Sequence, residues 1–145
     1  MRICKKISIA LVSSLLGAGL FAQSNLAHIS LVTFRSNLTY TIGEDTQSYT
    51  AERTLQPFSI NKFETTYSLW YTVKNRAEKI GYNFQNPGQG GSFGKRGAAP
   101  IEENISQPVT MISWYDAIVW CNALSEIRNK VPCYTYKGEV LRDSS

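Results

Sequence analysis

Histidine and cysteine are scarce in this sequence of 145 residues. It holds one histidine, His28, and three cysteines, of which only Cys121 and Cys133 follow residue 22. So close to the N-terminus, His28 is expected to be a solvated residue and not part of a Ser-His-Asp or Cys-His unit. Two cysteines and one distant histidine also do not make a metal-ligand set. We therefore assign no catalytic, cofactor-binding or metal-binding residue to this chain.

Only one long apolar run is present, at residues 7–22, behind the basic residues Arg2, Lys5 and Lys6. Its 16 residues are fewer than the roughly 20 that cross a bilayer. This pattern predicts a signal peptide cleaved after Ala22, and an uncleaved anchor is the alternative. We expect an exported protein, periplasmic or extracellular, with no stable membrane insertion after cleavage.

The chain also lacks a basic stripe. Removing the three basic residues of the leader leaves 12 Lys and Arg against 11 Asp and Glu. The longest basic cluster that remains is Lys95-Arg96. Nucleic acid is therefore not an expected partner.

Residues 82–107 are rich in glycine and have no regular apolar period. A phosphate loop would need Gly at position 89 and Ser or Thr at position 96, but the chain has Gln89 and Arg96. The dinucleotide fingerprint fails as well, because its third glycine would fall on Phe93. We expect a long surface loop.

Two helices are predicted around this loop. One runs over residues 67–80 after Thr66 and ends at Gly81. The other begins at Ser113, with Asp116 at the capping-box position. Their expected core faces are Leu69 or Trp70, Val73, Ala77 and Ile80 in the first helix, and Ala117, Trp120, Cys121 and Leu124 in the second.

Strands are expected within residues 26–41 and 55–64, with a polar connection over residues 43–53. A short strand at residues 109–112 leads into the second helix. Another strand at residues 133–136, before a Lys137-Gly138 turn, has no evident partner. Cys121 is expected on the buried helix face. Cys133 can pair with it in an exported protein, or with a cysteine outside this chain.

Three carboxylates are candidates for catalytic groups. Glu102 and Glu103 are adjacent in a loop, where such residues are usually solvated. Glu64 lies at a strand-to-helix junction, where the structural interpretation is that it satisfies backbone N–H groups. The spacing of these residues supports no reaction.

Two segments together resemble the sulfatase-modifying-factor family, which includes the formylglycine-generating enzymes. The first signature, a Phe-x-Ile-x-Lys strand followed by Glu-Thr-Thr and a helix, falls on residues 58–66. The second falls on residues 108–122. The matching residues are Phe58, Ile60, Lys62, Glu64, Thr65, Thr66, Pro108, Val109, Ile112, Ser113, Trp114, Asp116, Ala117, Trp120, Cys121 and Asn122.

The resemblance implies an α+β, C-type-lectin-like fold, loop-rich and truncated to its N-terminal portion. With the leader included, we expect a signal peptide at residues 1–22, an N-terminal segment at 23–37 and a partial family domain at 38–145. The family's Leu-Pro-Thr-Glu helix and the region that carries its copper-binding cysteine pair have no counterpart here. Cys121 matches a helix position and not a member of that pair.

For function, the resemblance implies an exported family member that is catalytically incomplete, whereas intact relatives oxidise a protein cysteine to formylglycine with O2. The family implies copper, or non-haem iron in related branches, with calcium as a further candidate, and none of these is assigned to residues of this chain. A protein or peptide substrate is the expected partner. The alternative is a non-catalytic, lectin-like module that binds a protein or glycan.

Overall fold

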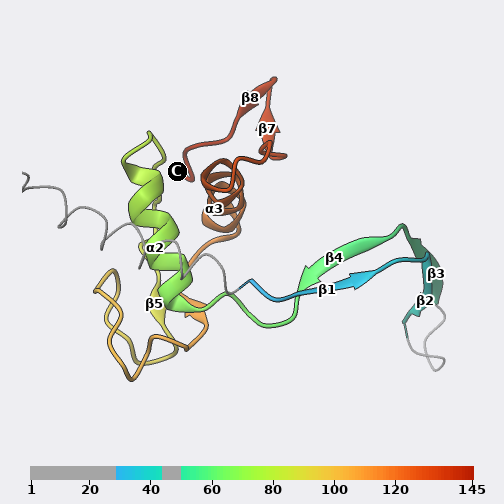
Figure 1. Cartoon of the computed structure of the whole chain (residues 1–145), viewed down its shortest axis with the longest axis horizontal. Helices are drawn as coiled ribbons and strands as arrows, with labels where there is room; N and C mark the ends of the chain where they lie inside the picture. The colour runs from blue at the N-terminus through green and yellow to red at the C-terminus, as the bar shows by residue number, and fades with distance from the viewer. Residues whose placement is uncertain (1–28, 44–49) are drawn as a thin grey trace, which may run out of the picture. The chain divides into compact units, whose positions relative to one another are not determined.

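The computed structural model describes residues 29–43 and 50–145, which hold two α-helices and eight short β-strands (Figure 1). The predicted signal peptide, Cys4 and His28 lie outside these residues. The described chain forms two compact units, Ile29–Glu64 and Thr65–Ser145. Neither helix of this part has the length and hydrophobicity that a membrane crossing requires.

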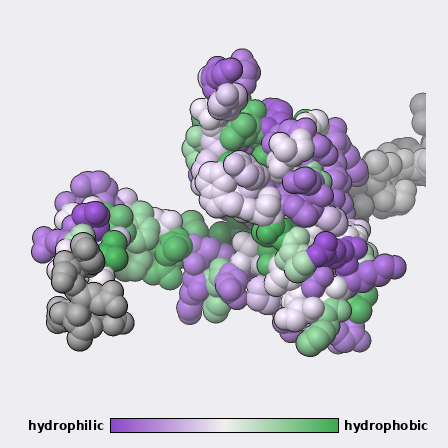
Figure 2. Space-filling model, turned by 180° about the vertical axis from the view of Figure 1, so that it is seen from behind, coloured by the Kyte–Doolittle hydropathy of each residue, from purple (hydrophilic) through white to green (hydrophobic). Residues whose placement is uncertain are grey.

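The first unit is built from two antiparallel strand pairs. β1 (Leu31–Phe34) pairs with β4 (Phe58–Asn61), and β2 (Leu38–Ile42) pairs with β3 (Ala51–Leu55). Since directly opposed residues share a face of the ladder, Phe34 and Phe58 meet there, and their rings stack with centroids 4.9 Å apart. Hydrophobic side chains of this unit remain exposed to solvent (Figure 2).

The strand predictions for this unit are confirmed except at one boundary. β1 and β2 lie in or next to the predicted range 26–41, and β4 lies in the range 55–64. The predicted end of the polar connection, at residue 53, was wrong, because β3 already begins at Ala51. Backbone pairing with β2 determines this strand, and a pair with no buried face requires no apolar alternation.

The second unit is centred on two helices, α2 (Tyr67–Glu78) and α3 (Trp114–Ile127). As predicted, Thr66 caps α2 by accepting a hydrogen bond from the Leu69 N–H at 3.3 Å. Ser113 and Asp116 form the predicted capping box of α3. The helices pack through Trp70 and Trp120, whose rings stack with centroids 5.7 Å apart.

The predicted core face of α3 was partly wrong. Trp120 is buried, but Cys121 is exposed, and Ala117 and Leu124 are only half-buried. The buried face instead carries Ile118, Val119, Trp120 and Ala123 together with two polar residues, Asp116 and Asn122. A hydrophobic period cannot predict this face, because the two polar side chains are buried through hydrogen bonds.

Ile80 also departs from its predicted role in the core. It is half exposed, because α2 ends at Glu78 and is followed by the C-cap Lys79. The chain then leaves the helix through Gly81, whose φ of 89° favours glycine.

Two short strand pairs complete the second unit. β5 (Gln89–Gly90) pairs with β6 (Val109–Thr110), which lies in the strand predicted before α3. β7 (Thr135–Tyr136) confirms the predicted strand near the C-terminus, and Lys137-Gly138 forms its turn. The partner that the sequence did not reveal is β8 (Glu139–Val140).

Candidate functional site

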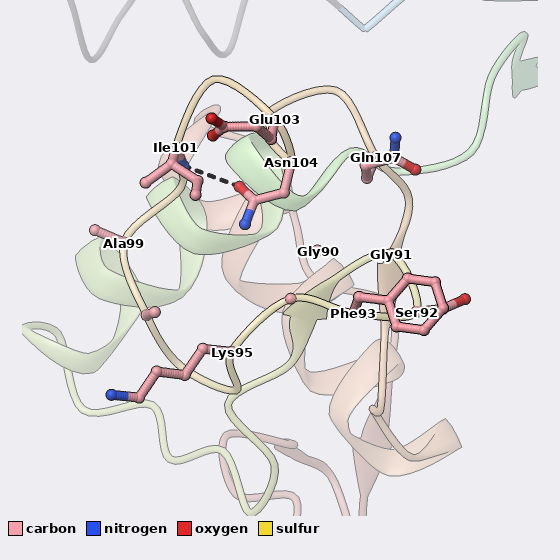
Figure 3. Close-up of a pocket in the computed structure, with 12 residues that line it drawn as sticks. Gly90, Gly91, Ser92, Phe93, Lys95, Ala99, Ile101, Glu103, Asn104 and Gln107 are labelled. Carbon is pink, nitrogen blue, oxygen red and sulfur yellow. Dashed lines mark hydrogen bonds between the residues drawn. The ribbon is translucent and has the colours of Figure 1, made fainter.

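A pocket of about 680 Å³ opens in the glycine-rich loop between β5 and β6 (Figure 3). One wall is the tight chain reversal at residues 90–95, and the other is the segment 98–107. Both walls belong to the unit Thr65–Ser145. The lining residues are Gly90, Gly91, Ser92, Phe93, Gly94, Lys95, Ala98, Ala99, Ile101, Glu103, Asn104 and Gln107.

Helix α2 holds the loop that carries the pocket. The Tyr67 hydroxyl donates a hydrogen bond to the Ala98 carbonyl at 2.6 Å, and the Trp70 indole N–H donates to the Pro87 carbonyl at 3.0 Å. Tyr67 is fully buried, and burial raises its pKa, with the nearby Tyr71 adding to the shift. The hydroxyl therefore stays protonated and remains a donor to the loop.

Gln89 holds the chain reversal that forms one wall of the pocket. Its buried side-chain amide donates to the carbonyls of Gly91, at 3.0 Å, and Ser92, at 3.1 Å. The Thr110 hydroxyl donates to the same Gly91 carbonyl at 2.5 Å. These bonds satisfy carbonyl groups that a turn would otherwise leave without partners.

Asn104 shapes the opposite wall. Its Oδ1 accepts a hydrogen bond from the Ile101 N–H at 2.9 Å, drawn as a dashed line in Figure 3. Gly90 lies so close that a Cβ there would come within 2.9 Å of the Asn104 Cβ. Gly90 therefore permits a close approach between the two walls.

The chemistry of the lining suits binding more than reaction. It offers backbone amides, two side-chain amides, the Lys95 ammonium, the Glu103 carboxylate and the exposed Phe93 ring. In Figure 3, the ammonium group of Lys95 extends away from Glu103, so the two charges are not paired with each other. Such a surface can hydrogen-bond an extended polar ligand.

Asp116, a residue of the second signature, is fully buried and accepts five hydrogen bonds. The donors are Asn86, Ser113 and Ser144, the last at 2.6 Å. Burial alone would raise its pKa, but the bonds from Ser144, Ser113 and Asn86 outweigh burial and lower the pKa to about 2. The carboxylate thus joins the start of α3 to two distant segments, which is a structural role.

Asn122 holds the β7–β8 hairpin in a similar way. Its side-chain amide donates to the carbonyls of Tyr134, at 2.7 Å, and Leu141, at 3.0 Å. Its Oδ1 accepts from the Tyr134 N–H at 3.0 Å. All hydrogen-bonding atoms of this buried side chain are therefore engaged.

The carboxylates that the sequence singled out do not form a site. Glu64 is exposed, and Thr66 provides the helix cap. Glu102 and Glu103 are exposed in a turn, where Glu103 lines the pocket. His28 lies outside the described residues.

The metals that the family implies find no donor set within residues 29–43 and 50–145, where no three His, Cys, Asp or Glu side chains cluster.

Sequence reasoning missed Tyr67, Gln89 and Asn104, which hold or line the pocket. A tyrosine at the start of an amphipathic helix looks like a core residue. An amide in a polar loop carries no signal of its own. Tyr67 bonds a carbonyl group 31 residues away, whereas Gln89 and Asn104 bond backbone groups two or three residues away.

The end of the first signature, at Thr65, meets the second signature within the second unit. The Val109 N–H donates to the Thr65 carbonyl at 2.9 Å, and the Tyr67 N–H donates to the Gln107 carbonyl at 2.8 Å. Deeper in the core, the Trp120 indole donates to the Trp70 carbonyl at 3.2 Å. The end of the first signature and the helix that follows it are therefore attached to the second signature.

Comparison with known proteins agrees with this arrangement. A family model, the sulfatase-modifying factor enzyme 1-like domain, matches residues 21–137. The crystal structure of CarF is similar, with a TM-score of 0.64 and 28% sequence identity over 79% of this chain and 45% of CarF. The chain thus spans less than half the length of that structure, and no curated protein matches its sequence significantly. With most of its length matched, the chain belongs to the sulfatase-modifying factor enzyme 1-like family.

Proposed function

We propose that this chain is part of an exported protein of the formylglycine-generating type and that it supplies scaffold and binding surface, not the reacting groups. In intact relatives the reaction is oxidation of a protein cysteine to formylglycine. The proposal also includes the C-type-lectin-like form of the fold and its truncation to the N-terminal portion.

One observation supports this proposal: three residues of the second signature are held by hydrogen bonds or buried in the core. The Asp116 carboxylate accepts five hydrogen bonds, and the Asn122 amide is fully engaged with the hairpin. Trp120 is buried against Trp70. Groups held in this way are not available to attack a substrate or to transfer protons.

The test is an aldehyde assay on a peptide containing Cys-x-Pro-x-Arg, with the purified 145-residue chain, copper and O2. We expect no aldehyde. If the coding frame continues beyond codon 145, the extended protein is assayed in parallel and is expected to produce aldehyde. Aldehyde formed by the 145-residue chain alone would overturn the proposal.

A second candidate function is a non-catalytic, lectin-like binding module. The pocket at residues 90–107 favours it, because hydrogen bonds from Tyr67, Gln89 and Thr110 hold the surrounding loop in one arrangement. A preorganised surface loses less entropy when it binds a ligand.

This candidate is tested by binding a panel of extended peptides and oligosaccharides to the wild-type chain and to two amide variants. Asn104→Ala changes the pocket wall, whereas Asn75→Ala removes an amide on α2 outside the pocket. We expect Asn104→Ala to weaken binding roughly tenfold, the size of one hydrogen bond to an uncharged group, and Asn75→Ala to leave binding unchanged. Equal affinity in all three proteins would rule out the pocket as the binding site.

A further inference from the structure

Two cysteine thiols lie at the junction between α3 and the C-terminal hairpin. Cys121 belongs to α3, and Cys133 lies two residues before β7. Both are free and both are exposed. Neither is needed for core packing, so reactivity and not packing decides what they can do.

The residues that follow these cysteines in the chain are joined directly. Asn122 and Tyr134 exchange two hydrogen bonds, at 2.7 Å and 3.0 Å, through the Asn122 side-chain amide and the Tyr134 backbone. We call this pair of hydrogen bonds the Asn122 clamp. Adjacent Cα atoms are about 3.8 Å apart, so the clamp brings the backbones at residues 121 and 133 near each other. A disulfide needs Cα atoms roughly 4.4–6.8 Å apart, so the two cysteines must lie close together, as these hydrogen bonds between their neighbours favour.

The titration of Cys121 agrees with this placement. Partial burial of the thiol raises its pKa, and the negative charge of a Cys133 thiolate raises it further. The second effect requires that the two sulfur atoms lie within range of each other's charge.

We propose that Cys121 and Cys133 form an intramolecular disulfide that ties the segment before β7 to helix α3. One thiolate attacks oxidised glutathione or another disulfide oxidant, and one thiolate leaves the oxidant. The second cysteine then attacks the mixed disulfide and releases the other thiolate. Two protein thiols are oxidised, one disulfide of the oxidant is reduced to two thiols, and the two protein protons pass to solvent or to the released thiolates.

The disulfide closes a short loop and reinforces the attachment that Asn122 already provides. Its formation depends on neither the metal chemistry of the family nor export, because glutathione supplies the oxidant in the test. Failure of the proposed function therefore leaves this inference standing, and the reverse is also true.

The experiment uses the full chain carrying Cys4→Ser, which removes the cysteine of the leader. The reduced protein is equilibrated with glutathione buffers, free thiols are alkylated, and the products are mapped by mass spectrometry. We expect a peptide pair linked through Cys121 and Cys133 in the monomer. The effective concentration of the two thiols should be at least about tenfold higher in native buffer than in concentrated urea, because the folded chain holds them together.

Two variants test whether the Asn122 clamp is responsible. Asn122→Ala should lower the native effective concentration toward the value in urea, whereas Asn75→Ala should not change it. An effective concentration in native buffer no higher than in urea would overturn the proposal. Cross-links found only between chains would overturn it as well.

Discussion

The indole ring of Trp120 stacks on that of Trp70 with 9° between the ring planes, and its N–H donates to the Trp70 backbone carbonyl. This contact joins α2, which follows the first family signature, to α3, which carries part of the second. Phe84 packs edge-on against Trp70, with ring centroids 5.8 Å apart. The three rings form the centre of the second unit.

Trp120→Ala should lower the free energy of unfolding by about 3–5 kcal/mol, because it removes a buried indole and leaves a cavity. Urea denaturation followed by circular dichroism measures the change. Trp114→Ala is the matched control, because Trp114 lies in the same helix but is 68% exposed. It should change stability by less than about 0.5 kcal/mol. Equal losses in the two variants would contradict the assigned packing.

The lowered pKa of Asp116 should make the stability of the fold depend on pH. Its pKa in the folded chain, about 2, lies below the ordinary value of 3.8. The unfolded chain therefore binds the proton more tightly, and the ionised carboxylate stabilises the fold at pH values above about 4. This contribution, about 2 kcal/mol, is lost as the pH falls from about 4 to 2.

Asp116→Asn should remove that dependence and should also be less stable at neutral pH. An amide cannot accept all five hydrogen bonds, so donors from Ser113 and Asn86 lose partners. Thermal unfolding between pH 2 and pH 7 measures both effects. Glu102→Gln, in an exposed turn, should follow the wild-type profile. A wild-type profile in Asp116→Asn would show that another group is responsible.

Asn122 determines whether the β7–β8 hairpin stays on α3. Asn122→Ala removes all three hydrogen bonds, so hydrogen exchange of the Tyr134 amide should become faster. Asn122→Asp keeps an acceptor for that amide but loses the donors to Tyr134 and Leu141. It should therefore protect the Tyr134 amide better than alanine does. Unchanged exchange in Asn122→Ala would exclude the clamp.

Gly88→Ala tests the close approach between the loop and α2. Gly88 has a φ of 74°, and an added Cβ would come within 2.8 Å of the Trp70 Nε1. Gly81→Ala is the matched control, since Gly81 also has a positive φ, 89°, but no atom within 4 Å of the added Cβ. In both variants, backbone strain at positive φ should lower the free energy of unfolding by about 1 kcal/mol. Gly88→Ala should lower it further because of the clash with Trp70. Chemical denaturation measures the free energy of unfolding of the two variants. Equal losses would mean that the loop moves away from Trp70 without further loss of stability.

Local sequence signals predicted the local structure well. Thr66 and Ser113 each cap the helix that the sequence indicated, and the Lys137-Gly138 turn forms as expected. The hydrogen bonds that stabilise a helix cap or a turn join residues only a few positions apart, so a short stretch of sequence contains both partners.

The candidate site could not be predicted in the same way. Gln89 and Asn104 carry no pattern in the sequence, and they bond backbone groups only two or three residues away. The course of their loop depends on α2, through the hydrogen bond from Tyr67 to the Ala98 carbonyl 31 residues away. The same reason explains the error over Cys121. A hydrophobic period predicts that polar residues face solvent. Asn122 is nevertheless buried on α3, because hairpin residues up to 19 positions away form hydrogen bonds with its side chain.

The sequence by itself determined the two helices, their caps and the family signatures, because each depends on residue spacing along the chain. Only the tertiary structure decided which face of α3 is buried and where the glycine-rich loop opens into a pocket. It also decided that the Asp116 carboxylate is held by Asn86 and Ser144. The free energy of a buried polar group depends on partners brought together from distant parts of the chain, and no local pattern contains them.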